Sequence, residues 1–470
     1  MSDAAHLPAA PGDRRRFDVD SERALAGVRA PSLVVGIVVA SGIALVLGLI
    51  RLGTPSLWFD EAFTADAVHR SPEWWVDNDQ YHVLYDSVAR AWTSLAGTSE
   101  WALRLPSVFG AMAACALLVV LARKVFDGWV ALVSGILLAT SPFLVKWSQQ
   151  ARGYTLLLAV SLVATLALLR ALERGTRGSW AVYGFAISAT VVWHAVAGLL
   201  LVPAHLVLIA QRRQKVLPHG PLAAVIFVAV AVPWAATIAM RSTGAGVGMN
   251  WLTAPTPAVV AHALLDISGA AGIGLVLAVV GLVVLRLGRR TDLAVWLGVW
   301  AFSPFVLALL PSSVRPIFLD RFLIVAAPAF ALLAGVAVTG IGRRLGALGA
   351  VAAVVATSLG LVAWYQTADR GNWRGEDWRS AVDAVVARNG EADAIVVAPW
   401  SARPAAAYYG APVTGLSSGD SIWLLTWSET GDDISAEDRR ALGFGDHVRV
   451  EKQQFGWRIS AQLWKRPGSP

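Results

Sequence analysis

The feature that most constrains this chain is a series of long apolar stretches that recurs from residue 32 to residue 365. Most of them hold about 18 or more residues, the length that crosses the roughly 30 Å hydrocarbon core of a bilayer as an α-helix. Hydrophobic residues make up 56% of the chain and charged residues 15%, whereas a typical soluble domain has roughly 45–50% and 25%. A soluble fold of this size cannot bury that excess, so the sequence predicts an all-α polytopic membrane protein.

The apolar stretches predict about eleven transmembrane helices, near residues 32–51, 105–122, 129–145, 153–171, 180–194, 196–210, 221–240, 270–285, 293–310, 322–340 and 347–365. Basic residues test this count, because cytoplasmic loops carry an excess of Lys and Arg. The basic clusters all fall on one face of the predicted membrane domain, at residues 14–16, 123–124, 174–177, 212–215, 286–290 and 343–344. We therefore expect a multi-pass plasma-membrane protein with its N-terminus in the cytoplasm and its C-terminal segment outside.

Charge, cysteine content and the first residues narrow the class further. The net charge of +7 and the pI of 9.8 come mostly from the cytoplasmic arginines, which suit anionic lipid headgroups and give no support to nucleic-acid binding. Cys115 is the one cysteine and lies in an apolar span, so neither an internal disulfide nor a cysteine-based metal site is expected. The polar residues 1–31 are expected to form a cytoplasmic tail before a retained first span.

Two outer segments are too long and polar to be simple connectors, namely residues 52–104 and 366–470. The first has the pattern of short interfacial helices with aromatic anchors. The second begins with helical spacing over residues 376–386 and continues with strand-like stretches. These stretches are residues 394–398, 421–426, 448–451 and 457–464. The sequence thus predicts a membrane domain over residues 32–365, followed by a small extracytoplasmic α/β domain.

An adjacent pair of acids, Asp60 and Glu61, stands shortly after the first predicted span and is bracketed by aromatic residues. A carboxylate in such a place costs desolvation unless it is paired, and its pKa can rise toward the range of a general base. The alternative is that both acids cap or salt-bridge the start of an interfacial helix. Spacing alone leaves both interpretations open.

Beyond this pair, several short motifs resemble those of the GT-C-fold membrane glycosyltransferases, the branch with protein O-mannosyltransferases, aminoarabinose transferases and actinobacterial mannosyltransferases. In that branch the first outer loop carries an Asp-Glu pair, as here. The other matching segments are Tyr81-His-Val-Leu-Tyr85, Arg104-Leu-Pro-Ser107, Ser148-Gln-Gln-Ala-Arg-Gly-Tyr154, Phe318-Leu-Asp-Arg-Phe-Leu323 and Glu376-Asp-Trp-Arg379. Two departures stand out, since Tyr85 lacks the usual preceding Pro-Pro and Gln150 replaces an acid. The resemblance covers about residues 50–400.

The resemblance implies an inverting reaction in which a polyprenyl phosphate is the leaving group. Asp60 would take the proton of the acceptor hydroxyl, and Glu61 would orient Asp60 or the acceptor. For the donor phosphate the expected ligands are Arg152, Arg315 and Arg321, with Lys146 and Arg104 as second choices, because a guanidinium suits bidentate phosphate contact. The alternative for these cations is ordinary snorkelling at the membrane boundary.

Four further residues are expected near the substrate, namely His82, Tyr85, Tyr154 and His194. The eight histidines are scattered without metal-binding spacing, so no metal and no cofactor are predicted. A cation held by Asp60, Asp77 and Asp79 is the alternative.

Taken together, the sequence predicts an inverting hexosyltransferase of the GT-C fold, with mannose the favoured sugar and a polyprenyl-phosphate donor. The acceptor is left open among a glycolipid, a polysaccharide and a protein. The rival function is a transporter or flippase of lipid-linked saccharides. Such proteins place ionisable residues and broken helices at the bilayer midplane, whereas the carboxylates here gather in one outer loop.

Overall fold

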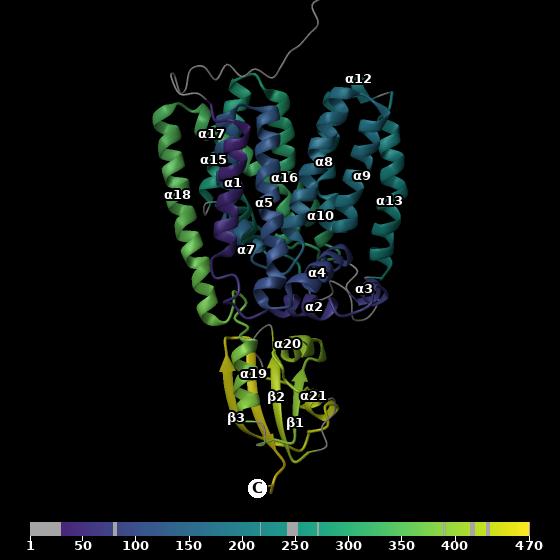
Figure 1. The fold of residues 1–470 in the computed structure, drawn as a ribbon, viewed down its shortest axis with the longest axis vertical. Coiled ribbons are helices and arrows are strands. Elements are labelled where there is room, and N and C mark those ends of the chain that lie inside the picture. Colours follow the sequence, from purple (N-terminus) through teal and green to yellow (C-terminus); the bar gives the residue numbers. More distant parts are fainter. Residues whose placement is uncertain are drawn as a thin grey trace, which may run out of the picture.

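A computed structural model describes residues 30–78, 82–216, 218–241, 252–269, 272–388, 390, 392–413, 419–428 and 433–469 of the 470-residue chain. It consists of a tall helical body and a small sheet domain at one end of that body (Figure 1). The predicted fold class, helical membrane core followed by a C-terminal α/β domain, is confirmed. The predicted cytoplasmic tail, residues 1–31, lies almost entirely outside the described residues.

Every predicted span coincides with a helix or a pair of helices. Two helices, α12 (Arg213–Val216) and α14 (Pro257–Ser268), lie outside the predicted spans. The others are α1 (Leu33–Leu49), α5 (Glu100–Val125), α6 (Gly128–Ala139), α7 (Pro142–Ser148), α8 (Tyr154–Arg174), α9 (Arg177–Trp193), α10 (Ala195–Leu199), α11 (Val202–Gln211), α13 (Gly220–Arg241), α15 (Ile273–Leu287), α16 (Thr291–Ser312), the 3₁₀ helix η2 (Asp320–Ala326), α17 (Ala327–Gly340) and α18 (Arg343–Gln366).

The number of eleven spans is not confirmed. Among the described residues, six helices are long and apolar enough to cross a bilayer, and the number rises to eight if each of two bent pairs counts as one span. One of these pairs is α6 with α7, which is bent by 58°. Helices α1 and α9 have 17 residues each, or roughly 26 Å at 1.5 Å per residue, just short of the hydrocarbon thickness.

Small residues bring the central helices together. A Cβ atom at Gly110 of α5 would lie 2.7 Å from the Thr155 hydroxyl and from the Leu156 backbone nitrogen of α8. At Gly135 of α6 it would lie 2.5 Å from a methyl group of Val119 in α5. Such close backbone approach is typical of membrane helices with small residues at the interface. It fixes the ends of α5 and α8 beside each other where the outer segments attach.

The first outer segment forms three short helices, α2 (Phe59–Ala67), α3 (Pro72–Asn78) and α4 (Val83–Ala96). They lie across the end of the helical body, between it and the sheet domain (Figure 1). Helix α4 is amphipathic, because Tyr85 and Ala89 are buried while Ser87, Arg90 and Ser94 are exposed. This is the interfacial character that the sequence predicts.

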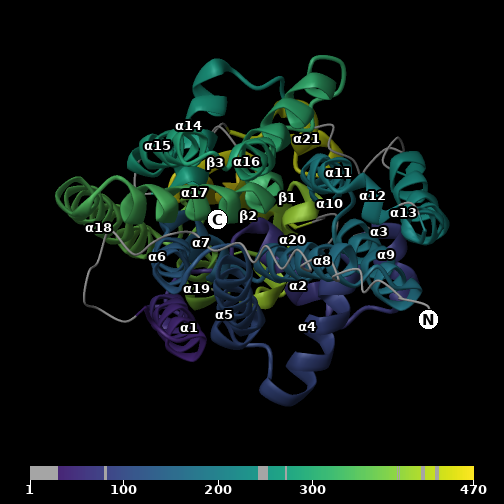
Figure 2. The same cartoon turned by 90° about the horizontal axis from the view of Figure 1, so that it is seen from above.

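The sheet domain contains four strands, as predicted. Its elements are the 3₁₀ helix η3 (Thr367–Arg370), α19 (Trp378–Ala387), β1 (Ala394–Ala398), the 3₁₀ helix η4 (Trp400–Ala402), α20 (Arg403–Tyr408), β2 (Ser421–Trp427), α21 (Ala436–Ala441), β3 (Val448–Phe455) and β4 (Ile459–Lys465). The strand order is β1-β2-β4-β3, with β1 and β2 parallel and the other two pairs antiparallel. Seen from above in Figure 2, the strands fall within the outline of the helical body, so the two parts are stacked.

Candidate active site

The site is built on the first turn of α2. Two acids, Asp60 and Glu61, stand in that turn, where negative charge is favoured by the exposed backbone N–H groups of a helix start. The Glu61 carboxylate reaches back and accepts the N–H of Trp58 at 3.3 Å, which closes the N-terminus of the helix.

Glu61 is completely buried and its carboxylate is fully occupied. Oε1 accepts from Arg104 Nε at 2.8 Å and from the Ala151 N–H at 2.7 Å. Oε2 accepts from Arg104 Nη2 at 2.6 Å, in addition to the Trp58 N–H. A carboxylate offers about four acceptor positions, so none is left to take a proton. The structural alternative, a salt bridge at the helix start, therefore describes Glu61, and its predicted role in orienting Asp60 or the acceptor stays a prediction.

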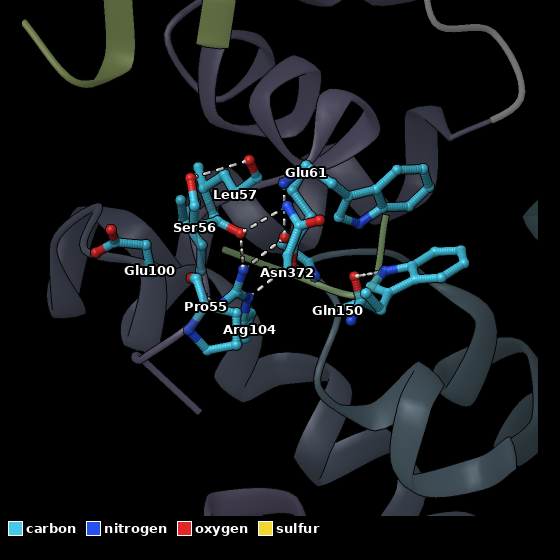
Figure 3. A network of polar contacts seen from close by, with 12 residues as sticks. Pro55, Ser56, Leu57, Glu61, Glu100, Arg104, Gln150 and Asn372 are labelled. Carbon is cyan, nitrogen blue, oxygen red and sulfur yellow. Dashed lines mark hydrogen bonds and ion pairs between the residues drawn. The ribbon is translucent and has the colours of Figure 1, made fainter. Parts of the chain in front are cut away.

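The hydrogen-bond donors of the Arg104 guanidinium are likewise all used within the protein (Figure 3). Its remaining N–H groups donate to the backbone carbonyls of Leu52 at 2.8 Å, Pro55 at 2.9 Å and Ser56 at 3.2 Å. Together with the two bonds to Glu61, these bonds use all five donors of a guanidinium. Arg104 thus holds the loop before α2, and its contacts leave no N–H group for the donor phosphate in this arrangement.

Asp60 is arranged differently from its neighbour. Its side chain is 24% exposed, and Oδ2 lies 3.5 Å from Nη2 of Arg321, a distance longer than a normal hydrogen bond. Arg321 comes from η2. Its guanidinium lies at nearly equal distances from the ring centroids of Trp58 and Trp147, 5.9 and 6.0 Å. Of the two adjacent acids, Asp60 is thus the one whose carboxylate reaches the surface.

A second cation, Lys146, also contacts the ring of Trp147. Its ammonium is 4.8 Å from the ring of Trp147 and 4.2 Å from that of Trp373, and it lies 3.2 Å from Oδ2 of Asp320. Asp320 directly precedes Arg321 in the chain. Of two predicted phosphate ligands, the structure therefore places Arg321 beside Asp60 and Lys146 beside Asp320, and both contact the ring of Trp147.

Arg152 lies behind the helix that carries Asp60. One of its Nη1 bonds goes to the backbone carbonyl of Asp60 at 3.1 Å and another to the Thr64 hydroxyl at 3.1 Å, while Nη2 lies 2.7 Å from a ring nitrogen of His82. These contacts place Arg152 and His82 next to the site, where they support the first turns of α2. Arg315 lies in the turn after α16, where its N–H bonds to the Pro311 carbonyl at 2.8 Å, and its predicted phosphate contact stays a prediction.

The remaining predicted residues divide into two groups. The rings of His82, Tyr154 and His194 form one cluster with centroids 6.0–6.3 Å apart, next to Arg152. Tyr85 is instead buried in α4, where its hydroxyl lies 3.3 Å from that of Ser107. Burial raises the pKa of the Tyr85 phenol, so the phenol stays neutral. Tyr85 therefore acts as a packing residue beneath the site.

No cation site emerges from the acids of the first outer segment. The parts of the chain that the structure describes contain no group of three or more His, Cys, Asp or Glu side chains placed to hold a metal ion. Asp79, one member of the alternative set with Asp60 and Asp77, lies outside those parts.

The segment that follows α18 also contributes residues to the site, and the sequence does not predict that they lie there. Gln150, which replaces the acid usual in similar proteins, accepts the indole N–H of Trp373 at 3.3 Å. Asn372 donates to the Ser56 carbonyl at 3.2 Å. The long separation along the chain, 223 residues between Gln150 and Trp373, explains why no local pattern predicts these contacts.

Glu376 provides the closest link between the sheet domain and Asp60. Its Oε2 accepts the N–H of Phe59, the residue before Asp60, at 2.7 Å. The other oxygen lies 3.7 Å from Arg458 Nη1 and 4.0 Å from Arg374 Nε. Burial raises the pKa of Glu376 to about 7, against the smaller opposing effects of Trp427, the Phe59 N–H and the two arginines. A titratable group of the sheet domain therefore holds the start of α2.

Two more contacts fasten the loop before α2 to the sheet domain. The Leu57 N–H donates to the hydroxyl of Tyr409 at 2.8 Å. Arg379 donates to the Thr54 carbonyl at 3.1 Å and pairs with Glu100 at the start of α5. The start of α2 is thus held from both parts of the molecule.

The fold defined by this arrangement is that of the GT-C membrane glycosyltransferases. Residues 83–236, about a third of the chain, match the family described as dolichyl-phosphate-mannose-protein mannosyltransferase. No curated protein sequence matches the chain. The predicted resemblance is confirmed at the level of the fold by the solved structures that match it.

Those structures include ArnT from Cupriavidus metallidurans bound to undecaprenyl phosphate, with a TM-score of 0.61 at 16% identity over 91% of this chain and 97% of that chain. The structure of the same protein in the apo state has a TM-score of 0.62 at 16% identity, over 92% of this chain and 98% of that chain. The oligosaccharyltransferase of Archaeoglobus fulgidus in the apo form gives 0.51 at 13% identity, over 80% of this chain and 63% of that chain.

Proposed function

We propose that the chain is an inverting glycosyltransferase that moves a hexose, with mannose as the first candidate, from a polyprenyl-phosphate donor to an acceptor hydroxyl. The observation that carries the proposal is the contrast within the acid pair. Glu61 is saturated by protein donors, whereas the Asp60 carboxylate reaches the surface beside Arg321, and Lys146 lies in the same cluster, paired with Asp320. A base next to two cations is what this transfer needs.

The chemistry assigns the proton to Asp60. The acceptor oxygen attacks the anomeric carbon from the face opposite the phosphate while Asp60 takes the hydroxyl proton. The new bond is between that oxygen and the anomeric carbon, and the bond that breaks joins the same carbon to the phosphate oxygen. The configuration at the anomeric carbon is thereby inverted.

Arg321 and Lys146 serve the leaving group. A sugar-linked phosphate carries one negative charge, and the polyprenyl phosphate that departs gains a second. Cations already in place stabilise this developing charge without reorganising. Undecaprenyl phosphate in the ArnT structure and dolichol-phosphate in a structure of the archaeal oligosaccharyltransferase AglB support a lipid-phosphate donor. The transporter alternative receives no support from these comparisons.

Other residues position these groups. Arg152 holds the Asp60 backbone, and Glu61 with Arg104 holds the loop before it. His82, Tyr154 and His194 form one wall of the site and are assigned to substrate contact. The catalytic face, with the sheet domain over residues 366–470, is assigned to the outside of the plasma membrane, as the basic clusters predict.

The experiment uses the full chain in lipid nanodiscs with radiolabelled polyprenyl-phosphate mannose and a membrane-lipid extract. We expect label to move from the donor to a new product whose glycosidic linkage has the opposite anomeric configuration from that of the donor. Retention of configuration would contradict the proposed mechanism. Absence of any transfer from the donor by the folded protein would contradict the proposed enzyme class.

A further inference from the structure

The sheet domain has a groove at the end that faces the helical body. Its volume is about 460 Å³, and it lies at the carboxyl ends of β1 and β2. That volume is in the range of roughly 300–1,000 Å³ that is typical of small-molecule sites. The carboxyl ends of parallel strands are also where open α/β sheets usually bind ligands. Both facts indicate a binding site separate from the one around Asp60.

The side chains that line the groove have the chemistry of a saccharide site. Trp400 is 70% exposed, so its ring offers a large flat apolar surface. Thr426, Ser428, Ser435 and Asp438 also line the groove. The Thr426 hydroxyl lies 2.6 Å from that of Ser460, and the Ser435 hydroxyl donates to Asp438 Oδ2 at 2.6 Å. A sugar presents just this combination, an apolar face of C–H groups and a rim of hydroxyls.

The charge of the groove favours a neutral ligand. Its charged lining residues, among those that the structure describes, are Asp433 and Asp438, and neither Lys nor Arg lines it. Asp433 is neutralised by Arg449 at 2.7 Å and Lys452 at 2.6 Å. A phosphorylated or carboxylated ligand would find no counter-charge among the lining residues.

One residue that lines the groove, Trp427, contacts the start of α2. The Trp427 side chain lines the groove, and its ring centroid lies 4.8 Å from that of Phe59 at an interplanar angle of 30°. Phe59 directly precedes Asp60. In Figure 1 the arrowheads of β1 and β2 point toward the helices of the first outer segment. The groove and the proposed base are thus linked through the contact of Trp427 with Phe59.

We infer that this groove binds the saccharide part of the acceptor, with Trp400 stacking on a sugar ring and Asp438 accepting bonds from sugar hydroxyls. The inference rests on the proposed function and names the acceptor class for it. A peptide acceptor fits less well, because extended peptides add along the edge of a sheet, whereas the groove lies at the ends of the strands.

The test measures binding without donor, so that it does not depend on catalysis. Full-length protein in nanodiscs is titrated into fluorescently labelled neutral oligosaccharides derived from mannan, galactan and arabinan, and into a labelled Ser/Thr-rich peptide. We expect at least one oligosaccharide to bind, and Trp400→Ala to weaken it about ten-fold or more, as loss of one aromatic contact of about 1.4 kcal/mol implies. Asp438→Asn should weaken the same ligand.

Two control variants distinguish a failure of the proposed saccharide site from a failure of the proposed function. Val448→Ala removes exposed apolar surface from β3, the opposite edge of the sheet, and should bind as the unchanged protein does. Asp60→Asn should also bind normally while it loses transfer, so normal binding together with retained transfer in this variant would overturn the proposed function alone. Absence of oligosaccharide binding, equal binding by Trp400→Ala, or binding of the peptide instead would overturn the saccharide site.

Discussion

Single residues decide the chemistry of this site, and the pair Asp60–Glu61 is the clearest case. Neighbouring residues of a helix point about 100° apart, so one carboxylate turns inward to Arg104 and the other toward Arg321. The sequence places both acids in an outer loop. It does not show which is open, because Arg104 follows Glu61 by 43 residues.

Arg321 is the first residue whose replacement should alter the reaction. We expect Arg321→Gln to lower kcat about 10²–10³-fold, because the developing phosphate charge loses a prepositioned cation, and Arg321→Lys to restore part of the loss. Steady-state transfer kinetics measure this. Arg70→Gln, which breaks an ion pair of 2.9 Å on the surface of α2, is the matched control. Equal losses in both variants would show that Arg321 acts through folding.

Arg104 should instead affect stability. Arg104→Met leaves the Glu61 charge buried without its partner, a change that typically costs about 3–5 kcal/mol. Thermal unfolding in nanodiscs should therefore show a lower midpoint. The double change Glu61→Leu with Arg104→Met should cost less than the sum of the two single changes. Simple additivity would mean that the buried pair does not act as a unit.

At the scale of elements, the site depends on how closely α5 and α8 approach. The apolar stretches predict both helices, and small residues predict close packing in general. The particular contact cannot be predicted, because Gly110 looks like any other glycine of an apolar span. Glycine is required there because the Thr155 hydroxyl of α8 leaves no room for a Cβ atom.

Two glycine variants test this packing. In Gly110→Ala the new methyl group would meet the backbone of α8 at 2.7 Å, so we expect a lower unfolding midpoint and weaker transfer. Gly42→Ala is the control, because a Cβ there meets nothing within 4 Å. If both variants unfold at the same temperature as the unchanged protein, α5 and α8 are not locked by this contact.

At the scale of the whole molecule, the stacked sheet domain completes the site. Sequence patterns predict its four strands and its place after the last span, since alternating and buried strands leave a local signal. The contacts that join it to α2 are long-range, such as Glu376 to Phe59 across 317 residues. No local pattern encodes them, although the acid itself stands in a motif that the sequence singles out.

Glu376 should make the docking of the two parts sensitive to pH. Its pKa is about 7 in the folded protein against 4.5 for an unperturbed Glu, so the folded state binds the proton more tightly than the unfolded state. Stability should therefore fall as pH rises from about 4.5 to about 7, by about 3 kcal/mol at most. Unfolding midpoints measured across this window should show the slope.

Glu376→Gln is the matched variant for this prediction. The amide oxygen can still accept the Phe59 N–H, while the group no longer titrates. We expect a flatter dependence of stability on pH and retained transfer activity. A slope identical to that of the unchanged protein would assign the pH dependence to another group.

The most direct measurement of the central claim compares transfer of radiolabelled mannose from polyprenyl phosphate by Asp60→Asn and Asp66→Asn in nanodiscs. Both variants change one acid of α2, and Asp66 pairs with Arg70 away from the proposed site. If Asp60 is the base, Asp60→Asn should lose at least about 10²-fold in kcat while remaining folded, and Asp66→Asn should keep its activity. Equal transfer by the two folded variants would contradict the account.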